Sequence, residues 1–226
     1  MSSKITLIVL FVISMLIMSF RSDSKKKKIL FFGDSITQMG VQPGGFIYLI
    51  DEMIKNEGLS EKYETIGSGI SGNKIYDLYL RLEDDVLSKS PDIVVIYIGV
   101  NDVWHKKWGT GTDYDKFGKF YEAIVKKLKA HHIKVIISTP AVIGEKADGT
   151  NEQDPDLNLY SSWIKTFSET NNLKFVNLRH LFYEYINANN PENKESGVLT
   201  VDRVHLNPKG NDLVARTFWN AIKEVK

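Results

Sequence analysis

Cysteine is absent from this chain of 226 residues. Without cysteine there are no disulfide bonds, no thiolate metal sites and no lipid-modified N-terminal cysteine, although the compartment of the protein stays open. A strong charge of one sign is also lacking, because the formal net charge is +1. Hydrophobic residues make up 42% and charged residues 25%, which is typical of a globular protein and excludes a disordered or fibrous chain. The length suits one well-buried domain and is short for two.

The small net charge hides an uneven distribution along the chain. Residues 1–28 contain six basic residues and one acidic residue, which leaves 23 basic and 27 acidic residues in residues 29–226, a net charge of −4. A nucleic-acid partner needs a basic face that neutralises phosphates, and this mildly acidic body does not offer one. We therefore expect no nucleic acid among the partners.

One long apolar run lies at the N-terminus, where Ile5 to Phe20 follow Lys4. Its 16 residues suit the core of a signal peptide and are slightly short for a membrane span. No A-x-A-like cleavage site follows, and the basic cluster Lys25 to Lys28 lies after the run, whereas retained positive charge favours the cytoplasmic side. We interpret residues 1–27 as a signal peptide or membrane anchor plus a basic linker, and residues 28–226 as the folded domain. An extracytoplasmic location (periplasmic, secreted or membrane-anchored) is favoured over an anchored domain that faces the cytoplasm, and cleavage stays open.

From residue 28 onward, short apolar runs alternate with segments of helical periodicity. Strands that are buried on both faces and alternate with helices imply parallel β-α-β units. The pattern predicts a three-layer α/β/α sandwich of about five parallel strands in a single domain. The expected strands are 29–32, 63–66, 93–98, 133–138 and 175–178, and the expected helices are 45–56, 73–89, 113–130, 155–170, 181–187 and 208–225.

Small and polar residues gather just after the predicted strands. In an open parallel sheet, ligands bind outside the carboxyl ends of the strands. The segments that follow the first four strands are Gly33-Asp34-Ser35, 69–73, 99–102 and 139–154, and three of these four carry groups unlike a packing surface. Chemistry is therefore expected at this edge of the sheet.

Ser35 lies at a strand-to-helix junction, where free backbone N–H groups at a helix N-terminus favour a developing negative charge. Taken alone, Gly-Asp-Ser also fits an ordinary helix N-cap. A nucleophilic serine needs a base, and among the five histidines His205 has an acidic partner at a convincing spacing, Asp202. A short Asp-x-x-His turn lets the carboxylate bind one ring nitrogen while the other accepts the serine proton. The alternatives are an incidental loop histidine or a metal ligand, and the lack of further ligands argues against a metal.

Three groups are candidates for an oxyanion hole, which is often the largest electrostatic contribution to acyl transfer. They are the backbone N–H of Ser35, the backbone N–H of Gly72 in a glycine-rich turn, and the side-chain amide of Asn101. Each of the last two is also a common turn residue. Because four separate segments place suitable groups at one edge of the sheet, the catalytic interpretation outweighs the individual alternatives.

Four sequence blocks together resemble the SGNH/GDSL hydrolase family. They are Gly33–Gln38 (GDSITQ), Ser71–Asn73, Gly99–Asp102 (GVND) and Asp202–His205, and they occur in the order of the family over nearly the whole folded region. The resemblance implies a flavodoxin-like α/β/α domain and esterase or deacetylase-type hydrolysis without metal or cofactor. It assigns the catalytic roles to the serine, aspartate and histidine named above and the oxyanion hole to the same three donors. Residues 67–69 are Gly-Ser-Gly where many relatives carry asparagine, which affects loop detail more than assignment.

Clues to the substrate are fewer. Trp104 and Trp108 lie in an expected loop directly after Asn101, and we list them as candidate substrate-binding residues because aromatic faces stack on sugar rings. Packing of both tryptophans against neighbouring loops is the alternative. Asp34 is a further candidate, although a structural role beside the nucleophile suits it better. We expect the long polar loop 141–154 to shape the side of the active site that binds the leaving group.

The leading hypothesis is therefore a serine esterase that acts on a small-molecule or glycan ester, either a carbohydrate O-acetylesterase or a short-chain acyl esterase. A lysophospholipase or thioesterase is the alternative among hydrolases. A non-catalytic sugar-binding module is the alternative from another class, and the complete catalytic set argues against it. A nucleotide- or flavin-binding module lacks both glycine-rich fingerprints of such folds. The oligomeric state stays open.

Overall fold

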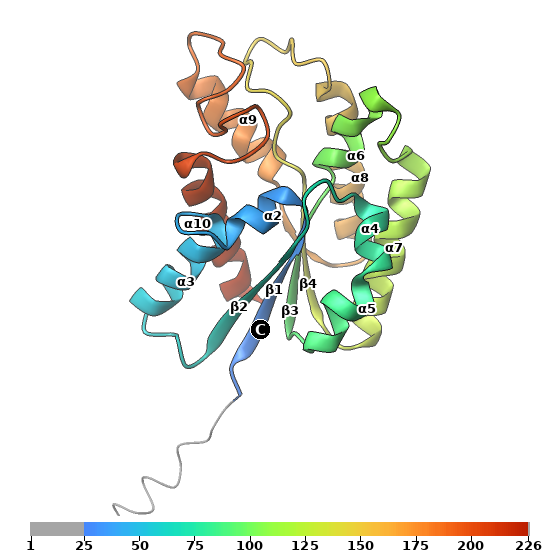
Figure 1. The fold of residues 1–226 in the computed structure, drawn as a ribbon, viewed down its shortest axis with the longest axis vertical. Coiled ribbons are helices and arrows are strands. Elements are labelled where there is room, and N and C mark those ends of the chain that lie inside the picture. Colours follow the sequence, from blue (N-terminus) through green and yellow to red (C-terminus); the bar gives the residue numbers. More distant parts are fainter. Residues whose placement is uncertain (1–24, 226) are drawn as a thin grey trace, which may run out of the picture.

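The computed structural model describes residues 25–225, and its central feature is a five-stranded parallel sheet between two layers of helices (Figure 1). The strand order β2-β1-β3-β4-β5 is that of a flavodoxin-like, doubly wound sheet. This confirms the predicted three-layer α/β/α sandwich and its strand number. The strands are β1 (Lys27–Gly33), β2 (Tyr63–Gly69), β3 (Ile93–Tyr97), β4 (Lys134–Ser138) and β5 (Lys174–Val176).

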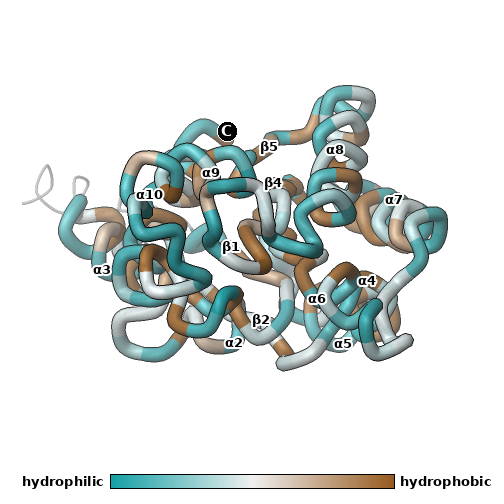
Figure 2. The backbone as a smooth tube through the Cα atoms, turned by 90° about the horizontal axis from the view of Figure 1, so that it is seen from above, coloured by the Kyte–Doolittle hydropathy of each residue, from teal (hydrophilic) through white to brown (hydrophobic). Residues whose placement is uncertain are grey.

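Helices cover both faces of the sheet, α3 and α10 on one side and α4, α7 and α8 on the other (Figures 1 and 2). The helical segments are α2 (Ser35–Gly40), α3 (Phe46–Asn56), α4 (Ile75–Leu80), α5 (Leu82–Asp85), η1 (Leu87–Lys89), α6 (Val100–Trp104), η2 (His105–Trp108), α7 (Tyr114–Ala130), α8 (Asp154–Thr170), α9 (Leu178–Asn189) and α10 (Pro208–Glu224). Figure 2 looks down on the carboxyl ends of the strands, with the strands running through the middle of the view.

The core lies on both faces of the sheet, which explains why the strands read as unbroken apolar runs. All five residues of β3 are buried. On the α3 and α10 side, the ring of Phe31 packs 5.6 Å from that of Phe46 and 6.0 Å from that of Phe218. On the opposite side, Phe117 of α7 packs 4.9 Å from Tyr160 of α8. Apolar burial on both sides is the main stabilisation of such a sheet.

Strand β2 is longer than predicted, and the extension matters for the site. It runs to Gly69 instead of ending at residue 66, because residues 67–69 stay in parallel register with residues 31–33 of β1. The end of β2 lies against the backbone of α2: a Cβ at Gly69 would be 2.1 Å from the backbone nitrogen of Gln38. Only glycine permits this approach, which brings the following turn beside the start of α2.

Three other elements differ from the prediction. The single helix expected at 73–89 is three short pieces, because the backbone turns out of the helix at Arg81 (φ −105°, ψ 11°) and at Val86 (φ −126°, ψ −62°). The last strand ends at Val176, since Leu178 already begins α9. The expected loop after Asn101 is instead helical, as α6 and η2.

The N-terminal prediction lies almost wholly outside the described residues. Strand β1 begins at Lys27, one residue before the expected domain boundary. Across residues 25–225, no helix combines the length and the apolar character that a bilayer crossing requires.

Candidate active site

The candidate nucleophile and the candidate oxyanion donors lie at the point where the strand order reverses. Ser35 begins α2 directly after β1, and Asn101 lies in α6, which follows the neighbouring strand β3. Such a switch point is where open α/β sheets bind ligands. Ser35 is buried, with 7% of its surface exposed.

A hydrogen-bonded series joins the three residues predicted as a triad. The Oγ atom of Ser35 lies 2.9 Å from Nε2 of His205, and Nδ1 of the same ring lies 2.6 Å from Oδ2 of Asp202. The structure therefore brings together residues that are 170 positions apart in the sequence. Geometrically, the imidazole can accept the serine proton on one nitrogen while the carboxylate fixes the other.

The aspartate and histidine belong to one tight turn before α10. Besides its bond to the ring, Asp202 accepts hydrogen bonds through Oδ1 from the backbone N–H groups of Val204 (3.1 Å) and His205 (2.8 Å). Partial burial acts to raise the pKa of Asp202, but the hydrogen bonds from the His205 side chain and from these backbone groups outweigh it and hold the pKa below its usual range. The carboxylate therefore stays ionised beside the imidazole.

Two of the predicted oxyanion donors are held next to each other. Gly72 occupies a turn with φ +77°, which suits glycine. Asn101 is 3% exposed, and its side-chain amide donates to the carbonyl of Asn73, the residue after Gly72, at 3.1 Å. On the other side of the turn, the N–H of Ser71 donates to Oε1 of Gln38 in α2 at 2.8 Å. The glycine turn is thus tied both to the nucleophile helix and to Asn101.

Asp34 is buried at the start of α2, which suits the structural role favoured for it from the sequence, and substrate binding by its side chain stays a prediction. It is 1% exposed, and its carboxylate accepts the N–H of Ile36 at 3.0 Å as the N-cap of α2. Asp102 is fully buried in the same way and accepts the N–H of Ile75 at the start of α4. Burial raises the pKa of Asp34 to about 7 and that of Asp102 to about 6.

Arg81 organises the same edge and was not singled out from the sequence. Its guanidinium donates to the carbonyl of Gly33 at 2.8 Å, to the hydroxyl of Ser68 at 3.1 Å and to Oδ1 of Asn73 at 2.7 Å. It thereby joins the ends of β1 and β2 to the glycine turn. Nothing in the local pattern distinguishes this arginine, because it lies inside an ordinary helical periodicity.

The tryptophans after Asn101 form a small aromatic cluster. Trp104 and Trp108 pack with ring centroids 5.7 Å apart, and the ammonium of Lys107 lies 4.3 Å from the Trp108 ring. Trp108 is 56% exposed, whereas Trp104 is partly buried against the core. Burial, together with the nearby charges of Lys74 and Lys107, lowers the pKa of His105 in this cluster. Sugar stacking on either tryptophan stays a prediction.

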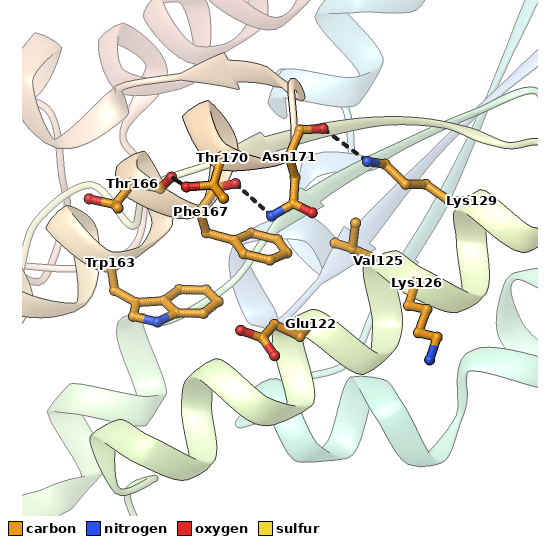
Figure 3. A pocket seen from close by; sticks show the side chains of 9 residues that line it. All are labelled: Glu122, Val125, Lys126, Lys129, Trp163, Thr166, Phe167, Thr170 and Asn171. Carbon is orange, nitrogen blue, oxygen red and sulfur yellow. Dashed lines mark hydrogen bonds between the residues drawn. The ribbon is translucent and has the colours of Figure 1, made fainter.

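A separate hollow of 530 Å³ lies between α7 and α8 (Figure 3). Its aromatic wall is Trp163 stacked on Phe167, with ring centroids 4.9 Å apart, and its rim includes Glu122 and Lys126. The Trp163 ring also lies against the backbone of Gly118, where an added Cβ would be 2.9 Å away. No triad residue lines this hollow, which is a gap between two packed helices. In the described part of the chain, no cluster of three or more His, Cys, Asp or Glu side chains is arranged to hold a metal ion.

Comparison with known proteins agrees with this geometry. The model of the GDSL-like lipase/acylhydrolase family matches residues 31–213, which span every element from β1 to the first turns of α10. The chain belongs to this family. As a member of the GDSL-like lipase/acylhydrolase family, it is a hydrolase of ester bonds, as the sequence blocks predicted.

The similar proteins include two acetylxylan esterases, both with solved structures. An acetylxylan esterase from Geobacillus stearothermophilus is 30% identical over 215 residues, which cover 87% of this chain and 94% of that protein. The crystal structure of the acetyl xylan esterase AlAXEase is 58% identical, with a TM-score of 0.85, covering 86% of this chain and 99% of that one. A crystal structure of the Geobacillus stearothermophilus enzyme is 27% identical with a TM-score of 0.76, covering 87% and 94%. Three further structures of that enzyme are described as catalytic mutants, in which a serine, a histidine and an aspartate are each replaced by alanine.

The raised pKa of Asp34 makes a prediction about stability. The pKa of Asp34 is about 7 in the folded protein and 3.8 for an ordinary aspartate, so the folded state binds an extra proton between these pH values. The free energy of unfolding of the wild type therefore falls as pH rises through this window. Asp34→Asn keeps the N-cap oxygen but does not titrate, so its stability should not fall for this reason. From pH 4 to pH 8, urea unfolding should show Asp34→Asn gaining about 4 kcal/mol relative to wild type.

The matched control is Asp113→Asn at the exposed start of α7. The hydrogen bond and charge of Lys116 lower the pKa of Asp113, so this variant should shift slightly in the opposite direction. If wild type and Asp34→Asn lost stability in parallel across the pH range, the buried carboxyl would not be the group that titrates.

Proposed function

We propose that this esterase removes acetyl groups from acetylated xylan or xylo-oligosaccharides through an acyl-enzyme on Ser35. The observation that carries the proposal is the unbroken series of short contacts from Ser35 Oγ to His205 to Asp202, at 2.9 and 2.6 Å. The same three residue types are the ones replaced in the catalytic mutants of the Geobacillus stearothermophilus enzyme. A pure sugar-binding module has no use for such a series.

In the first half of the reaction, His205 Nε2 takes the proton of the Ser35 hydroxyl while Oγ attacks the carbonyl carbon of the acetyl ester. Asp202 stabilises the imidazolium that forms. The tetrahedral intermediate collapses, the C–O bond to the sugar breaks, and the sugar hydroxyl leaves with the proton that His205 returns. In the second half, water loses a proton to His205 and attacks the acetyl-serine, which releases acetate and restores the Ser35 hydroxyl.

The negative charge on the carbonyl oxygen is stabilised by the backbone N–H groups of Ser35 and Gly72 and by the Asn101 side chain. Ser35 is the first residue of α2, where the N–H groups of the first turn have no intrahelical acceptor. The contact of the Asn101 amide with the Asn73 carbonyl fixes its orientation before substrate arrives. Donors fixed in advance need no reorganisation during the reaction.

An acetylated sugar is favoured over a lipid ester as the substrate because the similar proteins are acetylxylan esterases, the AlAXEase structure at 58% identity among them. The exposed ring of Trp108, with Lys107 beside it, offers an aromatic surface and a hydrogen-bond donor that suit a pyranose ring. A lysophospholipase or thioesterase would instead favour longer acyl chains.

Replacement of the nucleophile gives the first test of this proposal. Ser35→Ala should lower p-nitrophenyl acetate hydrolysis to near background, because no other group in the series can form the acyl-enzyme. Wild type should release acetate from acetylated xylo-oligosaccharides and lose activity steeply on p-nitrophenyl esters of longer acyl chains. Wild-type rates in folded Ser35→Ala, or a preference for long acyl chains, would refute the nucleophile or the substrate class respectively.

Asn101→Ala is the companion variant, since it leaves the nucleophile in place and removes one oxyanion donor. It should lower kcat by about 10²–10³ while remaining folded. Asn101→Ala should keep measurable activity and Ser35→Ala should have none, and this difference distinguishes an oxyanion donor from the nucleophile.

Trp108→Ala tests whether the aromatic cluster binds sugar. Because the small ester lacks a sugar ring, the variant should keep the wild-type kcat/KM for p-nitrophenyl acetate. Its KM for acetylated xylo-oligosaccharides should rise about 10-fold, in keeping with the loss of one stacking contact. Trp163→Ala, remote from the triad in the hollow of Figure 3, serves as the comparison. An unchanged KM in Trp108→Ala would leave this ring without a role in recognition.

We also propose that the enzyme acts outside the cytoplasm. The support is the apolar run Ile5 to Phe20 behind Lys4, whose length suits an export signal. Fractionation of cells that express the full chain should find the esterase activity in the membrane or extracytoplasmic fractions. A purely cytoplasmic distribution would overturn the proposal, and N-terminal sequencing of the product would show whether the segment is cleaved.

A further inference from the structure

Glu145, in the segment between β4 and α8, is a fully buried carboxylate that the mechanism above does not use. Its Oε1 atom accepts the backbone N–H groups of Leu199 and Thr200, both at 2.7 Å, and its Oε2 atom accepts the N–H of Val198 at 2.8 Å. Within residues 25–225, no lysine or arginine forms an ion pair with it. A buried carboxylate without a cation is costly unless several hydrogen bonds hold it, and three donors meet this acceptor-only group.

The three N–H donors belong to the segment that leads into the triad turn. Thr200 pairs with Leu206 as an antiparallel bridge, and the N–H of Val201 donates to the carbonyl of His205 at 2.8 Å. Residues 199–207 therefore form a small hairpin whose tip carries Asp202 and His205. One arm of this hairpin is bonded directly to the Glu145 carboxylate.

The tip of the hairpin is strained. Arg203, between the aspartate and the histidine, has φ +86°, a conformation that costs an L-residue about 1–2 kcal/mol. Two contacts hold it there: the N–H of Gly144 donates to the Arg203 carbonyl at 2.8 Å, and the Arg203 N–H donates to Oγ1 of Thr200 at 3.2 Å. Strained backbone persists only where its surroundings fix it. Gly144 and Glu145 thus hold the same turn from two sides.

The backbone of Glu145 is itself held in place. Its carbonyl accepts the side-chain amide of Asn190 at 2.6 Å, at the end of α9, and its N–H donates to the carbonyl of Glu195 at 3.0 Å. The carboxylate therefore sits in a frame built from α9 and the segment before the hairpin. Ser35 belongs to a different part of the fold, at the end of β1.

We propose that Glu145 is a positioning residue for the esterase reaction, whose carboxylate fixes the hairpin 199–207 so that His205 Nε2 reaches Ser35 Oγ. This inference rests on the proposed function of the triad. Its consequence is kinetic. A small displacement of His205 misaligns the proton transfer, and an error of 1 Å lowers the reaction rate about 10²-fold. The surface that binds the substrate does not change.

Glu145→Gln tests the proposal with nearly unchanged volume. Both carboxylate oxygens of Glu145 accept backbone N–H groups, and in glutamine one of these oxygens is replaced by an NH2 group, which cannot accept. At least one hydrogen bond to the segment 198–200 is therefore lost. For p-nitrophenyl acetate, kcat should fall about 10–100-fold while KM stays within about 3-fold. In proton NMR, the low-field signal of the His205 Nδ1 proton bonded to Asp202 should shift or broaden.

Glu195→Gln is the matched control, because it removes an exposed carboxylate from the same region. Its side chain forms an ion pair with Lys146 at 2.9 Å, while its backbone carbonyl still accepts the Glu145 N–H. This variant should keep the wild-type kcat and the wild-type His205 signal. Each kcat is calculated per active site, and the concentration of active sites is measured by titration of Ser35 with an organophosphate.

A second variant, Glu145→Asp, decides the matter if Glu145→Gln does not fold. It keeps the negative charge and shortens the side chain by one methylene, so the carboxylate no longer reaches all three N–H groups, and kcat should again fall with KM unchanged. Wild-type kcat per titrated site and an unshifted His205 signal in either folded variant would overturn the positioning role. If Ser35→Ala retained activity, the proposed function would fail instead, so the two failures are distinguishable.

Discussion

Strand β1 lies between β2 and β3 and is hydrogen-bonded to both, and the arrangement of the site depends on this pairing. Parallel strands align their carboxyl ends, so the segments that follow β1, β2 and β3 are brought to one edge. Those segments carry Ser35, Gly72 and Asn101. The close approach at Gly69 and the hydrogen bonds of Arg81 then bring the glycine turn against the start of α2.

Buried carboxylates do much of the local positioning around this edge. Asp34 accepts an N–H at the start of α2, Asp102 accepts one at the start of α4, and Glu145 accepts three before the triad turn. Each removes an acidic side chain from water and uses it to hold a backbone segment in one place. Asp202 does the same within its own turn while it also holds the imidazole. Hydrogen bonds to the backbone, rather than apolar packing alone, thus fix the geometry of the site.

Features that depend on the local sequence were predictable, and those that depend on distant contacts were not. Apolar runs and periodicity predict the strands and most helices because both reflect which faces are buried. The close pair Asp202 and His205 follows from a spacing of three residues. The role of Arg81 and the burial of Glu145 do not follow, because each depends on partners far along the chain, up to 48 positions away for Arg81 and 55 for Glu145. For Asp34 the sequence favoured a structural role beside Ser35, and its buried side chain caps α2.

The distance along the chain between the proposed nucleophile and its proposed base has a consequence for biosynthesis. Ser35 emerges among the first residues of the domain, whereas His205 follows 170 residues later and reaches the serine only after the last hairpin docks before α10. Contacts of such long range form late in folding, because the loop between them must close first. A nascent chain therefore carries the serine without the histidine. With the proposed triad as the catalytic group, esters are cleaved only when the C-terminal segment is in place, so activity reports that folding is complete.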